Sequence, residues 1–169
     1  MNILFHTGAA IGIIALCAQH IPRNPRPVQQ AGYGLLCFSL GIITHGILDY
    51  IPHCYPVPAA LDASLGLIII LLNLLFASGR YRFIIFSAFL GSVLPDLIDL
   101  APQIINKRTH IGMPTHSPYF PWHWKEFSGS IYNGHCLVSD INHITLLACV
   151  LLVCLVNRRH LKRLYLQRR

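Results

Sequence analysis

Apolar residues along this chain gather into five long segments, separated by short polar or proline-rich stretches. A helix needs roughly 20 apolar residues, within a range of about 17 to 25, to cross a membrane. The second, third and fourth segments meet that length; the first is polar at both ends, and the fifth is short unless it begins near Cys136. The pattern predicts an all-α, polytopic membrane helical bundle of about five transmembrane helices, in a single domain over residues 1–169. The segments run from about Ile3 to Ile21, Ala31 to Ile51, Ala59 to Ser78, Tyr81 to Ala101 and Ile141 to Val156.

The longest connection runs from Pro102 to Asn133 and precedes the last apolar segment. It is rich in proline and aromatic residues, among them Trp122 and Trp124. Because Trp and Tyr favour the headgroup zone of a membrane, we expect a long interfacial loop here.

Basic residues indicate how the segments are oriented. In a five-span arrangement, the first connection, the third connection and the C-terminal tail lie on one side, and these three stretches hold most of the Lys and Arg. The positive-inside rule makes that side cytoplasmic, so we expect the N-terminus outside and the C-terminus inside. Residues 157–169 then form a basic cytoplasmic tail. The residues concerned are Arg23, Arg26, Arg80, Arg82, Arg158, Arg159, Lys162, Arg163, Arg168 and Arg169.

Composition supports a membrane protein. Only 11% of the 169 residues are charged, which is less than half of the roughly 25% in soluble domains. The net charge is +7, but six of the thirteen basic residues fall in the last twelve positions. A basic tail after an apolar run marks a cytoplasmic end more often than a nucleic-acid site, so we expect no nucleic-acid partner. The six cysteines include no C-x-x-C pair. Cys54 and Cys136 fall on the same expected side, and the sequence leaves open whether they form a disulfide.

All six acidic residues lie at or near segment ends on the expected outer side, together with most histidines. Asp and His are costly in hydrocarbon, so such a concentration indicates function. Imidazole and carboxylate together suit a divalent metal ion, most simply zinc. The acidic residues are Asp49, Asp62, Asp96, Asp99, Glu126 and Asp140.

The strongest local motif is THGILDYIPH, in which His45, Asp49 and His53 are four residues apart. Residues at this spacing share one face of a helix and can chelate one ion. The alternative is a hydrogen-bonded pair of His45 and Asp49 with no ion. In GSVLPDLIDL, Pro95 weakens the helix end and Asp96 and Asp99 follow. These carboxylates suit a cation, or they are simply solvated at a helix end.

A third motif, THIGMPTHSPYF, lies in the long loop. His110 and His116 are candidate ligands that would close a metal shell from above, and Ser117 is a candidate to bind a phosphate oxygen or orient a water. The alternative is an ordinary interfacial loop. His123 stands between two tryptophans, so we assign it to the interface rather than to the metal.

Further candidates are single residues at segment ends. His6 and His143 lie on the same side as the motifs above and are candidate ligands. A carboxylate outside the metal shell, Asp99 or Asp140, is a candidate general base.

Taken together, these motifs resemble the membrane-bound metal-dependent hydrolases of bacterial inner membranes. The resemblance is carried by an early His, by LPD with a further Asp, by THS, and by TH-x-x-x-D on an apolar helix. It implies a metal-dependent hydrolase of the inner membrane. More distantly, HGILDYIPH is similar to a motif of zinc phospholipase C and P1-type nucleases, which implies a phosphodiesterase site with several zinc ions. The residues carried over from the first family are His6, His45, Asp49, Asp96, Asp99, His110 and His116.

The resulting hypothesis is a membrane hydrolase with one or more divalent metal ions, acting at the outer leaflet on a phosphoester of a phospholipid or another lipid-linked substrate. Two alternatives stay open. A metal-ion or proton transporter predicts ionisable residues across the full depth of the membrane, whereas here they concentrate at one side. A non-catalytic scaffold predicts that the His and Asp residues can be replaced without effect.

Overall fold

The computed structural model describes residues 1–166, apart from the side chains of residues 132 and 133. The described chain is mostly helical, which confirms the all-α prediction, and each of the five apolar segments forms a helix. The elements are α1 (Ile3–Ala18), α2 (Pro27–Tyr50), β1 (His53–Tyr55), α3 (Ala59–Phe76), α4 (Arg82–Asp99), α5 (Ala101–Thr109), the 3₁₀ turn η1 (Pro121–His123), β2 (Ser130–Asn133), α6 (Leu137–Val156) and α7 (Arg158–Leu166).

Two stretches expected to be irregular contain regular structure. The long loop begins with α5, which bends away from α4 by 55°, because Pro102 follows the end of α4 and starts a new helix. The basic tail forms α7, whose Leu164 is fully buried against the bundle. Packing of Leu164 accounts for the helix in the tail, whereas α5 buries none of its residues and owes its start to Pro102.

Among residues 1–166, three helices are long and apolar enough to cross a membrane: α2, α3 and α6. The bent pair of α4 and α5 would make a fourth span, while α1 is a shorter apolar helix of 16 residues. The structure therefore supports membrane-spanning helices but does not establish a count of five.

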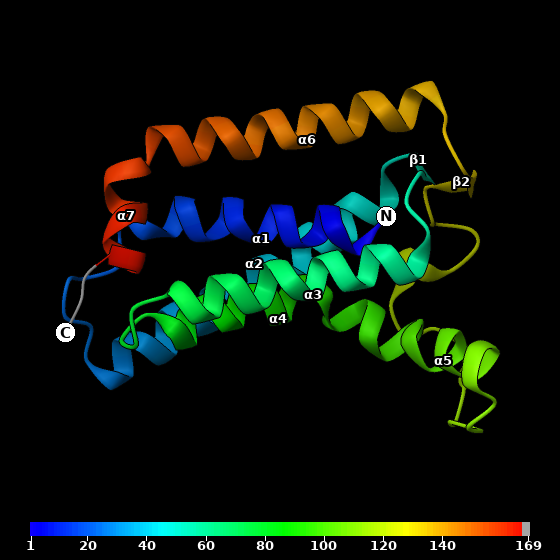
Figure 1. Cartoon of the computed structure of the whole chain (residues 1–169), viewed down its shortest axis with the longest axis horizontal. Coiled ribbons are helices and arrows are strands. Elements are labelled where there is room, and N and C mark those ends of the chain that lie inside the picture. Colours follow the sequence, from blue (N-terminus) through cyan, green and yellow to red (C-terminus); the bar gives the residue numbers. More distant parts are fainter. Residues whose placement is uncertain (167–169) are drawn as a thin grey trace.

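Helix α1 lies in the middle of the bundle, between α6 on one side and α2, α3 and α4 on the other (Figure 1). Eleven of its sixteen residues are buried. By contrast, α3 buries only Asp62 and Gly66, and α6 buries only Ser139 and His143, while both expose Leu and Ile side chains. Polar side chains thus turn inward and apolar ones outward, which suits a lipid environment.

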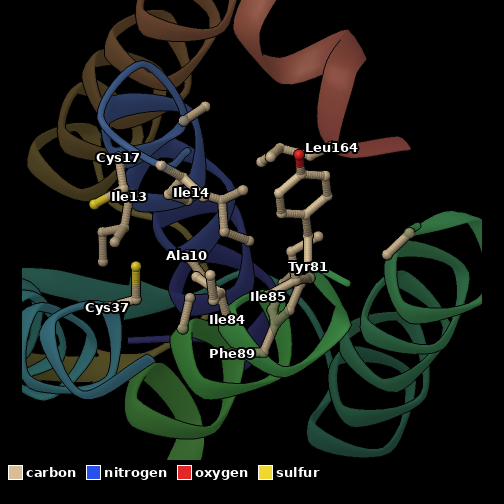
Figure 2. Close-up of a cluster of buried hydrophobic side chains, with 14 residues drawn as sticks. Ala10, Ile13, Ile14, Cys17, Cys37, Tyr81, Ile84, Ile85, Phe89 and Leu164 are labelled. Atoms are coloured by element: carbon tan, nitrogen blue, oxygen red, sulfur yellow. The ribbon is translucent and has the colours of Figure 1, made fainter. Parts of the chain in front are cut away.

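The half of the bundle near the C-terminal end of α1 is a dry apolar core. Figure 2 shows one cluster of packed side chains from three helices. It contains Ile14 of α1, Ile85 and Phe89 of α4, Leu164 of α7, and Tyr81, which directly precedes α4. All five are nearly or fully buried. This core holds α1, α4 and α7 together at the end of the molecule opposite the acidic residues.

Glycines bring α2 and α4 into close contact. A Cβ atom at Gly91 would overlap the carbonyl oxygen of Phe38, and one at Gly41 would collide with the backbone at Ser92. Small residues allow this close backbone approach in membrane helix pairs. As a result, the C-terminal ends of α2 and α4 lie side by side.

The opposite end is closed by polar contacts and a covalent bond. Asp62 of α3 accepts the backbone N–H groups of Ile3 and Leu4 at 2.8 and 2.9 Å, so it caps α1 rather than its own helix. Strands β1 and β2 pair in parallel. Next to them, Cys54 and Cys136 form a disulfide, with Cα atoms 6.2 Å apart and 82 residues between them in sequence. The sequence had left this pairing open.

Candidate metal centre

Four buried or largely buried side chains converge where α2, α4 and the loop of residues 110–129 (the aromatic loop, which contains η1) meet. His45 and Asp49 come from α2, Asp96 from α4 and His123 from η1. Each offers one ligand atom, and these atoms all lie within 4.8 Å of one another. The i, i+4 spacing on α2 places its two side chains on one face, and the close α2–α4 packing brings Asp96 opposite them. This cluster can hold a metal ion.

Five of the six distances among the four ligand atoms are close to those of a tetrahedral shell. Nε2 of His45 lies 3.2 Å from Asp49 Oδ2 and 3.6 Å from Asp96 Oδ1. Nε2 of His123 lies 3.1 Å and 3.3 Å from the same two oxygens, and the two Nε2 atoms are 3.4 Å apart. A tetrahedral ion with ligand distances of about 2.05 Å has neighbouring ligand atoms about 3.3 Å apart. The side chains therefore need little movement to surround such an ion.

Both imidazoles are oriented for metal binding by their other ring nitrogen. His45 Nδ1 donates a hydrogen bond to the carbonyl oxygen of Ser92 at 2.7 Å. His123 Nδ1 donates to Asp99 Oδ2 at 2.8 Å. Since a carbonyl and a carboxylate only accept, each Nδ1 carries the proton, and in the neutral ring the lone pair is on Nε2. An acceptor behind the ring, as here, is the usual partner of a metal-bound histidine.

Charge in this region also favours a cation. Three carboxylates (Asp49, Asp96 and Asp99) are at most 6% exposed. Burial opposes protonation of His123, but hydrogen bonds to Asp49, Asp96 and Asp99 outweigh it and raise the pKa of His123 to about 10. Oδ1 of the buried Asp96 has Nε2 of His123 3.3 Å away as its counter-charge, and a metal ion bound by the neutral ring would take over that role.

His6 of α1 borders the four ligands. Its ring stacks on that of His45, with centroids 3.9 Å apart, and its Nε2 lies 3.2 Å from Asp49 Oδ1. In the described part of the chain neither ring nitrogen of His6 makes a hydrogen bond, although the side chain is fully buried. The α-amino group of Met1 also contacts Asp49. His6 is therefore the histidine closest to joining the metal shell.

Asp99, a candidate general base, has a different place. Its two oxygens accept the backbone N–H groups of Tyr119 and Phe120, both at 3.0 Å, in addition to the ring of His123. A carboxylate with three donors is not free to take a proton from a water. Its role in the structure is to hold the loop and to orient His123.

Two other predicted ligands are buried nearby but bound elsewhere. His53 lies in β1 rather than on the face of α2, because the helix ends at Tyr50 before Pro52. Its ring nitrogens contact the carbonyl of Ile51 at 2.8 Å and the Tyr55 hydroxyl at 3.1 Å. His143 stacks on Phe5 with ring centroids 3.7 Å apart. The structure does not bring either residue into the four-ligand cluster.

The remaining candidates lie apart from the cluster. His110 is exposed and ends α5 in the left-handed conformation, whereas His116 contacts the carbonyl of Ser117 and the ring of Tyr119 at the surface. Asp140 is half exposed beside His135. The THS motif therefore adds no ligand to the metal shell, and neither Ser117 nor Asp140 belongs to the four-ligand cluster.

His123, which the sequence assigned to the interface rather than to the metal, takes the place expected for the loop histidines His110 and His116. The aromatic segment folds inward as a 3₁₀ turn, and the His123 side chain is only 5% exposed. A sequence signal was present, because Pro121 on one side and bulky rings on both sides favour a packed turn over a mobile surface loop.

The chain matches none of the known protein-family models, curated proteins or solved structures with which it was compared. The candidate centre therefore stands on its own geometry.

Proposed function

We propose that the protein binds Zn²⁺ at His45, Asp49, Asp96 and His123. The supporting observation is the set of 3.1–3.6 Å spacings among these ligand atoms, because zinc prefers four N and O ligands in a tetrahedron of this size. The acceptors behind both imidazoles support the same ion.

We further propose that the protein is a metal-dependent hydrolase that acts on a phosphoester of a phospholipid or another lipid-linked substrate. Zinc lowers the pKa of a bound water to about 7 and polarises the bond to be cleaved. His6 is the candidate for proton transfer, because it is buried beside Asp49 with unsatisfied ring nitrogens. Asp99 positions His123. Catalytic zinc sites keep a position for water, and Asp96 would be the ligand that makes room for it, because it also borders a cavity.

We place the protein in the bacterial inner membrane as five spans, with the N-terminus and the metal centre at the outer face. The disulfide beside the centre supports this side, because such bonds persist in oxidising compartments. The basic α7 lies at the other end of the bundle, which agrees with a cytoplasmic C-terminus. Helix α1 would be the shortest span, surrounded by the others.

A metal transporter is the second candidate, because a closed shell of four protein ligands is less typical of zinc catalysis. The apolar core around Ile14, Ile85 and Phe89 opposes it, since the described residues of this core include no Asp, Glu, His, Lys or Arg that could carry an ion through the other half of the bundle. Zinc flux into proteoliposomes above that of empty vesicles would favour the transporter.

Elemental analysis of the detergent-purified protein tests the metal. We expect one zinc per chain, lost in the double variant His45→Ala/Asp49→Ala and retained in the matched double variant His116→Ala/Asp140→Ala, which removes the same two residue types outside the centre. Wild-type protein without stoichiometric metal, or equal losses in both double variants, would contradict the site. Hydrolysis of phospholipid phosphoesters should likewise stop on addition of chelator and return with zinc.

A further inference from the structure

An apolar cavity of about 720 Å³ adjoins the metal centre. It lies between the start of α3, the end of α4 and α5, and its lining includes Val57, Ala63, Leu97 and Ile104. Asp96 belongs both to this lining and to the four-ligand cluster. The candidate metal site and the cavity therefore share Asp96 as a common wall, and the volume of the cavity is typical of small-molecule sites.

We propose that this cavity binds an acyl chain of a membrane lipid, with the polar part of that lipid at the metal centre. This rests on the proposed function and assigns the part of the molecule that recognises the substrate.

The polarity of the walls selects an amphiphile. The other carboxylate in the lining, Asp62, is engaged by the N-terminal N–H groups of α1, so it offers little to a polar ligand. Asp96 is different, because its Oδ1 faces the metal ligands. A ligand that fits has an apolar body and one polar end, and a sugar or a free nucleotide would leave its polar groups unpaired along the apolar walls.

The position of the opening favours a chain that enters from the bilayer. Leu97 and Ile104 are 49% and 44% exposed although they line the cavity. The neighbouring helix α3 likewise exposes the apolar side chains of Leu61 and Leu65. In Figure 1, α5 bends away from the line of α3 at this end of the molecule. A lipid chain can therefore enter sideways without crossing water.

Photo-crosslinking in nanodiscs tests the proposal, with a phosphatidylglycerol that carries a diazirine in one acyl chain. We expect crosslinked peptides to concentrate in residues 97–105 rather than on α6. Ala63→Trp should lower that labelling by about fivefold, because an indole occupies the space of several methylenes. Ala148→Trp is the matched control, an exposed alanine on α6 outside the cavity, and should leave the labelling unchanged.

Labelling spread evenly over α3 and α6, or labelling insensitive to Ala63→Trp, would overturn the cavity assignment. Zinc content and the helical circular-dichroism signal are measured in every sample, and the latter shows whether each variant is folded. Stoichiometric zinc with even labelling would refute the acyl-chain site alone, whereas localised labelling without zinc would refute the metal proposal alone. If Ala63→Trp does not fold, the wild-type crosslink map decides by itself between the cavity and the outer surface.

Discussion

Asp99→Asn is the sharpest perturbation of the candidate centre, because it changes the support of a ligand without touching the ligand set. Asp99 accepts three hydrogen bonds, from Tyr119, Phe120 and His123, over distances of 2.8–3.0 Å. An asparagine offers one acceptor oxygen and places an NH₂ group at the other position, so at least one of the three donors loses its partner. His123 Nδ1 then faces at best a neutral amide oxygen, a weaker acceptor than the carboxylate, and it loses its acceptor if the NH₂ group takes the Oδ2 position.

The expected effect is a loss of zinc affinity rather than of the site. Removing the acceptor behind a metal-bound histidine typically weakens binding by about 10- to 100-fold, which corresponds to about 1.4–2.7 kcal/mol. Part of the loss also comes from the loop, since Asp99 holds two of its backbone N–H groups. Replacing His123 itself by Ala should cost more, because a ligand is then missing.

A competition titration against a chromophoric zinc chelator measures this change in detergent at constant pH. Asp140→Asn is the matched control, because it makes the same substitution at a carboxylate outside the centre. A dissociation constant for Asp99→Asn within about twofold of wild type, or an equal loss in Asp140→Asn, would refute the assignment of His123 as a ligand held by Asp99.

Two further changes probe the scaffold. Gly91→Ala should lower the free energy of unfolding by at least about 1–3 kcal/mol, because the added methyl overlaps Phe38 of α2, and it should also lower zinc affinity. Gly8→Ala, which has open space around it, should do neither. Equal thermal stability of the two variants would contradict the close packing of α2 and α4. Burial lowers the pKa of His53 from 6.5 in the unfolded chain to about 4 in the folded protein. As the pH falls from 6.5 to about 4, His53 is therefore protonated in the unfolded chain before it is protonated in the folded protein. The free energy of unfolding, measured with urea in detergent and chelator, should fall there by at most about 1.4 kcal/mol per pH unit, and an identical slope in His53→Gln would refute this.

Sequence pattern was sufficient for most of the helical framework. Each apolar segment became a helix, because runs of this length and composition leave few other ways to satisfy the backbone in an apolar environment. The order of the segments also predicted that the Asp residues and most His residues lie at one end of the bundle. For this reason His45, Asp49 and Asp96 were named together as ligands, and the structure brings them together.

The ligand that the loop contributes could not be predicted from the sequence pattern. The fourth ligand, His123, reaches the centre because Asp99 accepts the backbone N–H groups of the preceding residues and turns the chain inward. That contact joins residues more than twenty positions apart and leaves no periodic trace in the sequence. The THS histidine His116 lies on the same loop before this turn and stays at the surface.

The two ends of the bundle depend on different interactions. At one end, Ile14, Ile85 and neighbouring apolar side chains pack against one another, and this core needs no ligand. At the other end, buried carboxylates and imidazoles from α2, α4 and the loop lie within 4.8 Å of one another, so an ion could bridge them. Since helices in lipid gain little from apolar contact with one another, a cation that joins Asp49, Asp96 and His123 would supply much of the cohesion at this end. Metal binding and order in the aromatic loop are then linked, and whatever displaces the ion also loosens the wall of the adjoining cavity.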